Sequence, residues 1–426
     1  MGDCGNKRIN DRGSGVIKPH RRKEHRQGLV IVMVLWVVIL LGVIIGALGR
    51  SSRVDAKVCA ADIQGLKLKW ACRAGTDTAI AVLKEDGRAS DNLRDLWSAN
   101  EEDFNNIELD GCSFEVKVVD EASKLNVNTA TKKQLMELPG MTEEIADSII
   151  DWRDSDDAPS QSGVEGGYYQ SLHYGYKIRN GPFRTIRELL LVKGVSTELL
   201  YGKETKWIDY LTCYSTDNNK DAGGEKRINI NKADENKLTE SLKIKKSYSK
   251  WVVENRPKDK GYESIADLIS DKSPTKAEGD SQKESEKAEP LDLETFNMIA
   301  DKITVTDDER IAGRISINTA PKIVLAALSG GGEEAEKLAD NIITYRKSLS
   351  GGMESIAEIM KASSMKIDTF KKIANYITTR SDIYSIYSTA TSEDVRGRAA
   401  RLETEVVVDR STSPNTILYQ YQGVSN

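Results

Sequence analysis

Five carboxylates lie close together between residues 151 and 165. Asp154, Asp156 and Asp157 are nearly adjacent, Asp151 precedes them by one helical turn, and Glu165 follows a turn that contains glycine. Hard oxygen donors on a loop suit Ca²⁺, which takes about six to eight of them at about 2.3–2.6 Å. The regular EF-hand spacing is absent. The spacing therefore leaves two interpretations open, a cation site and a solvated acidic loop.

The helix that carries Asp151 is predicted to begin after Thr142, because threonine is a typical N-cap residue. The residues at helical spacing that predict its buried face are Ile145, Ile149 and Trp152. Residues 154–182 show no periodicity, so a long loop is predicted to follow.

The stretch around this helix recurs twice further along the chain. Its opening, Asn128-Thr129-Ala130, returns as Asn231-Lys232-Ala233 and Asn318-Thr319-Ala320, and each asparagine is predicted to be a helix N-cap. The closing halves recur as well, and begin at Phe183, Tyr262 and Met353. The order predicts three helical modules, over residues 121–227, 228–310 and 311–380. The second contains a polar insertion, residues 271–290, which is predicted to be disordered.

An uncharged run from residue 29 to residue 49 is long enough to cross a bilayer as a helix. Residues 1–28 before it hold eight basic and three acidic side chains. This flank predicts a cytoplasmic leader, a single pass through the inner membrane and a periplasmic location for the rest. The sequence leaves open how the cysteines beyond the membrane pair, namely Cys59, Cys72, Cys112 and Cys213.

Strand patterns flank the helical modules on both sides. Residues 106–119 alternate around Asp110-Gly111 and predict a β-hairpin at the end of the segment 50–120. Residues 381–426 contain three further strand patterns, which are predicted to extend the same sheet. The fold class is therefore predicted to be α+β, with the helical modules inserted into a sheet domain.

The same sequence also bears on two other functions, DNA binding and catalysis. Helices joined at Pro139-Gly140 resemble the helix-hairpin-helix motif of DNA-binding proteins, so a membrane-anchored DNA-binding protein of competence type is the alternative. Residues 121–160, however, carry nine acidic and four basic side chains, a charge that repels phosphate, so no nucleic-acid partner is expected. His173 is the single histidine after the membrane run and no nucleophile lies beside it, so the protein is predicted not to be an enzyme.

Two sets of residues resemble a known family. Arg26-Gln27-Gly28 before the apolar run resembles a type IV prepilin leader, which a prepilin peptidase cuts between Gly28 and Leu29. Residues 151–159, Gly163-Val164-Glu165 and Asn180-Gly181-Pro182-Phe183 resemble the K-type minor pseudopilin of the type II (general) secretion pathway.

The resemblance implies a pseudopilin fold, which has a long N-terminal transmembrane helix, a small antiparallel sheet and an inserted all-α domain of helix-hairpin-helix (SAM-like) modules. It implies I-type and J-type minor pseudopilins as partners, and a non-enzymatic subunit at the tip of the periplasmic pseudopilus that helps to start its assembly. Met33 stands where ordinary pilins carry glutamate, a lack that the K-type family shares. The resemblance also implies calcium, assigned to Asp151, Asp154, Asp156, Asp157 and Glu165.

Overall fold

The computed structural model describes residues 25–269, 287–393 and 399–423. Most of the basic leader and most of the predicted insertion, residues 271–290, lie outside the described residues. The chain divides into two compact units, Met1–Leu66 and Lys67–Asn426.

The first unit consists, in its described part, of most of helix α1 (His25–Glu85). This helix is long and apolar enough to cross a membrane, and its large apolar side chains from Leu29 to Leu48 are exposed. The predicted apolar anchor is therefore confirmed as a helix of the required length. Gly65 and Gly75 do not interrupt it, although each lowers helix propensity by about 1 kcal/mol relative to alanine.

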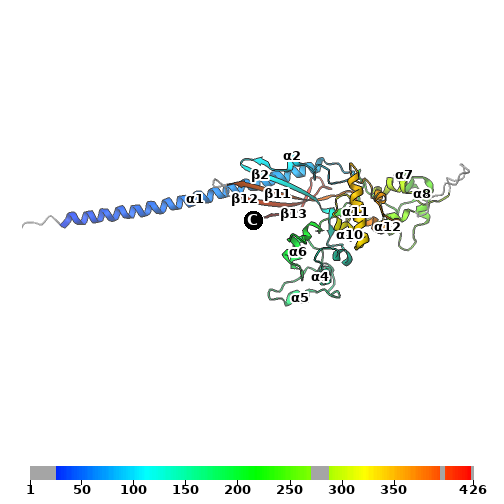
Figure 1. Ribbon diagram of the computed structural model, residues 1–426, viewed down its shortest axis with the longest axis horizontal. Coiled ribbons are helices and arrows are strands. Elements are labelled where there is room, and N and C mark those ends of the chain that lie inside the picture. The colour runs from blue at the N-terminus through cyan, green and yellow to red at the C-terminus, as the bar shows by residue number, and fades with distance from the viewer. Residues whose placement is uncertain (1–24, 270–286, 394–398, 424–426) are drawn as a thin grey trace, which may run out of the picture. The chain divides into compact units, whose positions relative to one another are not determined.

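The second unit contains a five-stranded antiparallel sheet with the order β1-β2-β11-β12-β13 (Figure 1). Its strands are β1 (Ile107–Leu109), β2 (Cys112–Asp120), β11 (Ile383–Glu393), β12 (Ala399–Asp409) and β13 (Thr416–Gly423). Asp110 and Gly111 both have positive φ, as a tight hairpin turn requires. The predictions of the hairpin and of C-terminal strands that extend it are both confirmed.

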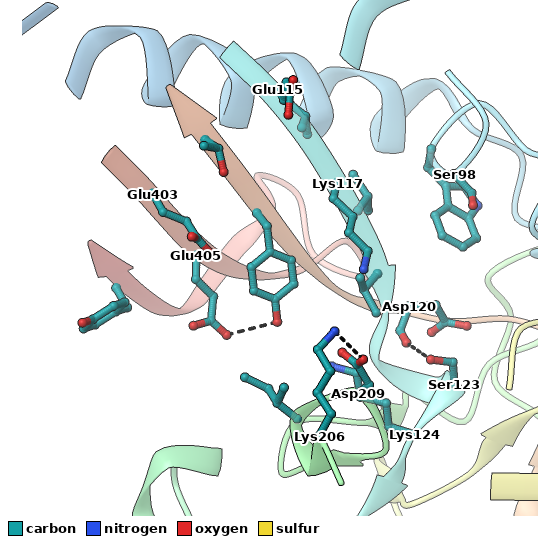
Figure 2. Close-up of a pocket in the computed structure, with 18 of the residues that line it drawn as sticks. Ser98, Glu115, Lys117, Asp120, Ser123, Lys124, Lys206, Asp209, Glu403 and Glu405 are labelled. Atoms are coloured by element: carbon teal, nitrogen blue, oxygen red, sulfur yellow. Dashed lines mark hydrogen bonds and ion pairs between the residues drawn. The ribbon is translucent and has the colours of Figure 1, made fainter. Parts of the chain in front are cut away.

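The C-terminal part of α1 packs on one face of this sheet. Leu83 joins Val118, Tyr384 and Val406 in a buried cluster. At Gly75 a Cβ atom would overlap Ser388 Oγ and would lie 2.9 Å from side-chain carbons of Phe114 and Val116. Glycine is therefore required here by the close approach of helix and sheet. The opposite face carries charged side chains such as Lys117 and Glu405 (Figure 2).

Three segments of the chain between β2 and β11 share one local geometry, in which a parallel pair of two-residue strands joins the start of the segment to its end. Repeat 1 contains β3 (Leu125–Asn126), α3 (Lys132–Met136), α4 (Glu143–Arg153), α5 (Gly166–Ser171), η2 (Ile186–Leu191), α6 (Thr197–Tyr201), η3 (Trp207–Asp209) and β4 (Leu211–Thr212). Repeat 2 contains β6 (Ile228–Asn229), α7 (Glu235–Leu242), α8 (Lys246–Glu254), η4 (Ile265–Leu268), α9 (Leu293–Ile299), η6 (Ala300–Lys302) and β7 (Ile303–Thr304). Repeat 3 contains β9 (Ile315–Ser316), α10 (Lys322–Leu328), α11 (Glu333–Ser348), η7 (Ile356–Lys361), α12 (Ile367–Ile373), η8 (Ala374–Tyr376) and β10 (Ile377–Thr378). Outside the repeats lie α2 (Glu101–Phe104), η1 (Glu121–Ser123), β5 (Thr216–Asp217) and β8 (Ile311–Ala312).

One asparagine in each repeat joins the opening half to the closing half. In repeat 1, Asn128 Nδ2 donates to Phe183 O at 3.0 Å and its Oδ1 accepts from Phe183 N at 2.7 Å. Asn231 and Asn318 bond in the same way to the residues Tyr262 and Met353. The prediction that these asparagines are helix N-caps is therefore wrong, because both polar groups of the side chain are used across the repeat.

Other side chains cap the helices instead. Thr131 and Gln134 form a capping box at the start of α3, and Asp234 caps α7. The predicted loop 154–182 also needs correction, because it contains the helix α5 (Gly166–Ser171). Tyr169 of α5 is fully buried and packs edge-on against Trp152, at 5.2 Å between ring centroids. Packing thus supplies a helix for which the local sequence pattern gives no signal.

In each repeat, an arginine in the last turn of the second helix, or just after that helix, bonds the segment that follows the opening strand. Arg153 donates to the carbonyls of Val127 and Ala130. The matching bonds in the other repeats run from Arg256 to Ile230 and Ala233, and from Arg346 to Ile317 and Ala320. These hydrogen bonds are equivalent in all three repeats. The classification of the repeats as helix-hairpin-helix modules stays a prediction.

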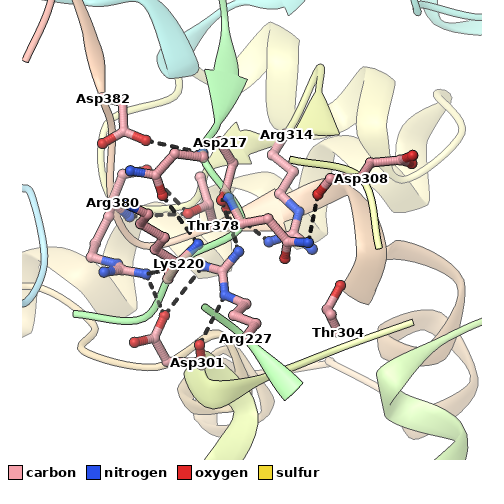
Figure 3. A network of polar contacts seen from close by, with 12 residues as sticks. Asp217, Lys220, Arg227, Asp301, Thr304, Asp308, Arg314, Thr378, Arg380 and Asp382 are labelled. Atoms are coloured by element: carbon pink, nitrogen blue, oxygen red, sulfur yellow. Dashed lines mark hydrogen bonds and ion pairs between the residues drawn. The ribbon is translucent and has the colours of Figure 1, made fainter. Parts of the chain in front are cut away.

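The segments that join the repeats meet at a buried network of charges (Figure 3). Arg227 bonds both oxygens of Asp217 at 2.8 and 2.9 Å, and Arg314 reaches the same carboxylate at 2.8 Å. Burial alone would raise the pKa of Asp217, but the two guanidinium groups lower it to about 2. This carboxylate is therefore ionised and fully paired.

We expect Gly75→Ala to destabilise the protein by about 1–3 kcal/mol, because the added methyl group overfills the interface of α1 with the sheet. The control is Gly65→Ala in the same helix, where a Cβ meets nothing within 4 Å. This control is expected to be neutral or stabilising by up to about 1 kcal/mol. Chemical denaturation of the full chain in detergent measures both variants, and equal effects at the two positions would contradict the packing argument.

Candidate metal centre

Helix α4 positions the first carboxylates of the acidic cluster. Thr142 Oγ1 accepts from Ile145 N, so the predicted N-cap is confirmed. Asp147 and Asp151 lie one turn apart and are both buried. Trp152, the next residue of the helix after Asp151, stacks with Phe183 at 6.2 Å between ring centroids. The core packing of α4 thus fixes where these two carboxylates point.

The segment after α4 folds back onto these two aspartates. Both oxygens of Asp151 accept from Ser160 N, at 3.0 and 3.1 Å, and Asp147 Oδ2 accepts from Ser162 N at 3.1 Å. A Cβ atom at Gly163 would overlap Asp151 Oδ2 and would lie 3.0 Å from the carbonyl carbon of Asp147. The close turn therefore depends on glycine at position 163.

Three of the five predicted ligands meet at the end of this turn. Asp151, Asp154 and Glu165 each place a carboxylate oxygen within 4.8 Å of the other two. Asp154 Oδ1 and both oxygens of Glu165 are buried and have no hydrogen-bond partner within the described part of the chain. Burying an ionised carboxylate without a hydrogen-bond donor or a cation costs free energy. A positively charged ligand would offset that cost at these atoms.

The electrostatics of the cluster agree with that geometry. Burial, and after it the nearby charges of Asp151 and Asp154, raise the pKa of Glu165 to about 7. Burial also raises the pKa of Asp154, with further contributions from Asp156 and Asp151. The carboxylates therefore repel one another, and a bound cation would relieve the repulsion.

The remaining two predicted ligands lie outside the three-carboxylate group. Asp156 is exposed, and its Oδ1 accepts from Ala158 N at 2.8 Å. Asn180 Nδ2 donates to Asp157 Oδ1 at 2.8 Å and to Asp156 O at 3.0 Å. The structure thus brings together three of the five residues, while a ligand role for Asp156 and Asp157 stays a prediction.

A second acidic group shows how a buried carboxylate is satisfied without a cation. Asp86, Asp91 and Asp95 also place oxygens within 4.8 Å of one another. There, however, Arg410 bonds Asp86 at 2.9 Å and also pairs with the fully buried Asp91. The counter-charge is already present in this second group, so it is not a candidate metal site.

Some residues that build the site were missed from the sequence. Asp147 and Gly163 hold the turn, and Asn180 fixes the acidic segment from its far side. A signal existed for Asp147, because it precedes Asp151 by four residues on the same helix face. No local pattern predicts the role of Asn180, whose partners lie 23 and 24 positions earlier.

The fold combines a long N-terminal helix, an antiparallel sheet and a large helical insertion that carries the carboxylate cluster. Comparison with known proteins shows which family this arrangement resembles. Residues 92–203 match the family model of type II secretion system (T2SS) protein K, a segment that contains the carboxylate cluster. The resemblance to the K-type family is thereby confirmed.

Individual proteins give the same result with additional detail. The chain is 23% identical over 197 residues to type II secretion system protein K of Klebsiella pneumoniae, which covers 41% of this chain and 60% of that protein. It is also 26% identical over 166 residues to endonuclease/exonuclease/phosphatase family domain-containing protein 1 of Danio rerio, covering 37% of this chain and 26% of that protein. The alignments thus span well under the full length of both relatives.

A solved structure shares the fold. One chain of the GspK-GspI-GspJ complex from the type 2 secretion system of enterotoxigenic Escherichia coli superposes with a TM-score of 0.50 and 15% identity. The superposition covers 86% of this chain and 99% of that chain. It therefore extends the similarity from residues 92–203 to most of the fold.

We expect Ca²⁺ to stabilise the protein by about 2–3 kcal/mol at about 100 times its Kd, relative to chelator. Glu165→Gln should abolish most of this gain. In chelator above pH 7, however, the same substitution should stabilise the protein, because it removes one of three repelling charges. Thermal unfolding with Ca²⁺ or EDTA measures both effects. Glu143→Gln is the matched control and should retain most of the gain, because Glu143 is exposed at the start of α4 and lies outside the group.

The sign of the pH dependence follows from the same pKa. Since folding raises the pKa of Glu165 from 4.5 to about 7, protonated Glu165 stabilises the cation-free protein at low pH, and this contribution is lost as the pH rises through 7. Calcium should therefore be most stabilising above pH 7. Equal stability in Ca²⁺ and in EDTA at pH 8 would refute the site.

Proposed function

We propose that the protein is a non-enzymatic minor pseudopilin of the K type, placed at the tip of the periplasmic pseudopilus. There it would help to start pseudopilus assembly, for the export of folded proteins across the outer membrane. The observation that carries the proposal is the match of residues 92–203 to protein K of the type II secretion system. The fold likeness to a chain of the GspK-GspI-GspJ complex supports it.

The partners in this proposal are I-type and J-type minor pseudopilins. The support is the solved complex, in which a chain with this fold is found together with GspI and GspJ. Four large hydrophobic side chains on α1 beyond the membrane run are exposed, namely Val58, Ile63, Leu66 and Trp70. Such an apolar helix surface fits packing against other pseudopilin helices.

The membrane anchor is the apolar part of α1, and we place it in the inner membrane with the N-terminus in the cytoplasm. The helix meets the requirement of length and composition. The proposed orientation of the helix rests on the eight Lys and Arg residues between positions 7 and 26, which flank the anchor on its N-terminal side. We further propose that prepilin peptidase removes the leader between Gly28 and Leu29.

Placement at the tip rests on Met33 and on the size of the helical insertion. Ordinary pilins neutralise the N-terminal amine of a neighbouring subunit with a buried glutamate, and Met33 cannot do so. A subunit that lacks this group fits the filament end, where one neighbour is absent. The three repeats are also bulky, so they would clash with neighbours inside a regular filament.

Calcium is the proposed ligand of the carboxylate cluster. Asp151, Asp154 and Glu165 would hold it, with Asp156 and Asp157 as the further ligands expected from the family resemblance. The ion would supply positive charge to a group of buried oxygens and would fix α4 to α5, because Glu165 immediately precedes α5. Its role in this proposal is structural.

The DNA-binding alternative receives little support from the geometry. In repeat 1, the hairpin between α3 and α4 presents the exposed acids Glu143 and Glu144 at the start of α4, where a phosphate would have to bind. Like charges at that position oppose nucleic acid.

Mixing the detergent-solubilised full chain with its cognate I-type and J-type proteins should give one complex that contains all three. Size-exclusion chromatography with light scattering measures its mass. The control is the same mixture with a major pseudopilin in place of the J-type protein. Migration of the chain alone, in the presence of both partners, would overturn the proposed function.

Peptidase action should leave Leu29 as the first residue of the mature chain. Gly28→Val should block this processing and leave the leader attached, whereas Gly42→Ala in the same apolar helix should not. N-terminal sequencing of membrane-extracted protein reads the result directly. A mature start at any other residue would refute the assignment of the leader.

A further inference from the structure

The last strand of the sheet leaves one of its edges open. β13 pairs with β12 and with no other strand that the structure describes. A bulge interrupts the register near its start, and from Tyr419 to Gly423 the pairing is regular. The outward N–H and C=O groups of these five residues form a row onto which another extended chain can add.

The two edges of this sheet differ in how they are protected. Natural edge strands are kept from pairing by short length, by charged side chains or by proline. β1, at the opposite edge, has three residues with Glu108 at its centre. β13 has eight residues, none of them charged and none proline, and Ile417 and Tyr421 are 53% and 43% exposed. Only β1 is built as a protected edge.

A cavity of about 760 Å³ lies beside this open edge, against the polar face of the same sheet. Tyr421 and Gly423 of β13 contribute to its wall. Figure 2 shows Lys117 and Glu405 projecting from the sheet, with Lys206 and Asp209 of repeat 1 nearby. Since side chains alternate between the faces of a sheet, an added strand would direct every second side chain to the cavity side.

The chemistry of the cavity defines what kind of segment fits. Five acidic and five basic residues line it, so it has no net charge. Several are already paired, as Arg187 with Glu405 at 2.9 Å and Lys206 with Asp209 at 2.7 Å. The Arg187 guanidinium also lies 4.1 Å from the centroid of the Tyr421 ring. The lining therefore favours uncharged side chains that can pack on tyrosine and accept or donate hydrogen bonds.

We propose that β13 is completed by an extended, uncharged segment of a partner minor pseudopilin, which adds as a sixth strand and places alternate side chains against the cavity. The identity of the partner rests on the proposed function. The mode of binding rests on the open edge and the neutral cavity. Main-chain hydrogen bonds would supply much of the affinity, and the cavity would select the side chains.

Hydrogen–deuterium exchange separates strand addition from side-chain packing, because only strand addition protects backbone amides along one edge. The full chain in detergent is measured alone and with the cognate I-type and J-type proteins. We expect the outward-facing amides between Tyr419 and Gly423, which do not donate to β12, to exchange at least about tenfold more slowly in the complex. Amides of β1 should be unchanged and serve as the internal reference.

A pair of substitutions tests the same surface by affinity. Gln420→Lys with Gln422→Lys puts charge on exposed positions of β13 and should weaken the complex at least about tenfold. Glu108→Gln with Leu109→Lys is the matched control, because the two substitutions together make the same change of +2 in charge at exposed positions on the opposite edge. An unchanged fold of each variant is checked by thermal unfolding.

The outcomes distinguish this inference from the proposed function. A three-protein complex that forms without protection of β13, and that tolerates both lysines, would overturn strand addition and leave the proposed function intact. Protection of β13 in the chain alone at high concentration would assign the edge to a second copy and overturn the proposed occupant. Absence of any complex would overturn both.

Discussion

The central pair of the sheet imposes the main constraint on this chain. β2 and β11 are neighbours in space, yet every helical repeat lies between them in sequence. The intervening chain therefore has to leave the sheet and return to the same place. Each repeat meets this requirement locally, because its two short parallel strands bring its end beside its start. Repeats of this kind can be added without disturbing the sheet.

Charge pairing separates the structural carboxylates from the candidate site. Asp217 is buried between Arg227 and Arg314, and Asp91 is buried against Arg410. Both have a guanidinium group that offsets the cost of burial. Glu165 has no such partner, and both of its oxygens are buried and unbonded among the described residues. This difference favours an external cation at the group that contains Glu165. Asp217 and Asp91 are instead neutralised by arginine side chains of the protein itself.

The sequence predicted those features whose signal is local. The apolar anchor, the hairpin around Asp110-Gly111 and the Thr142 cap are each encoded within a few residues. The role of Asn128 was predicted wrongly, because an asparagine before a helix looks like a cap unless its partner Phe183, 55 positions away, is known. The cluster was predicted in part, since spacing identifies Asp151, Asp154 and Glu165 but does not show that Asp156 points to solvent. Long-range packing decides these cases.

The hydrogen bonds from Ser160 and Ser162 to the helix α4 have a kinetic consequence. They hold the turn through backbone N–H groups that donate to Asp151 and Asp147, and Gly163 lets that turn approach the helix closely. The turn therefore does not depend on the ion for its shape. Exchange of the ion would then proceed at the pace of dehydration and diffusion, without waiting for a segment to refold. In the proposed function, in which the site lies in the periplasm and binds calcium, such a site would be loaded after the chain has left the cytoplasm.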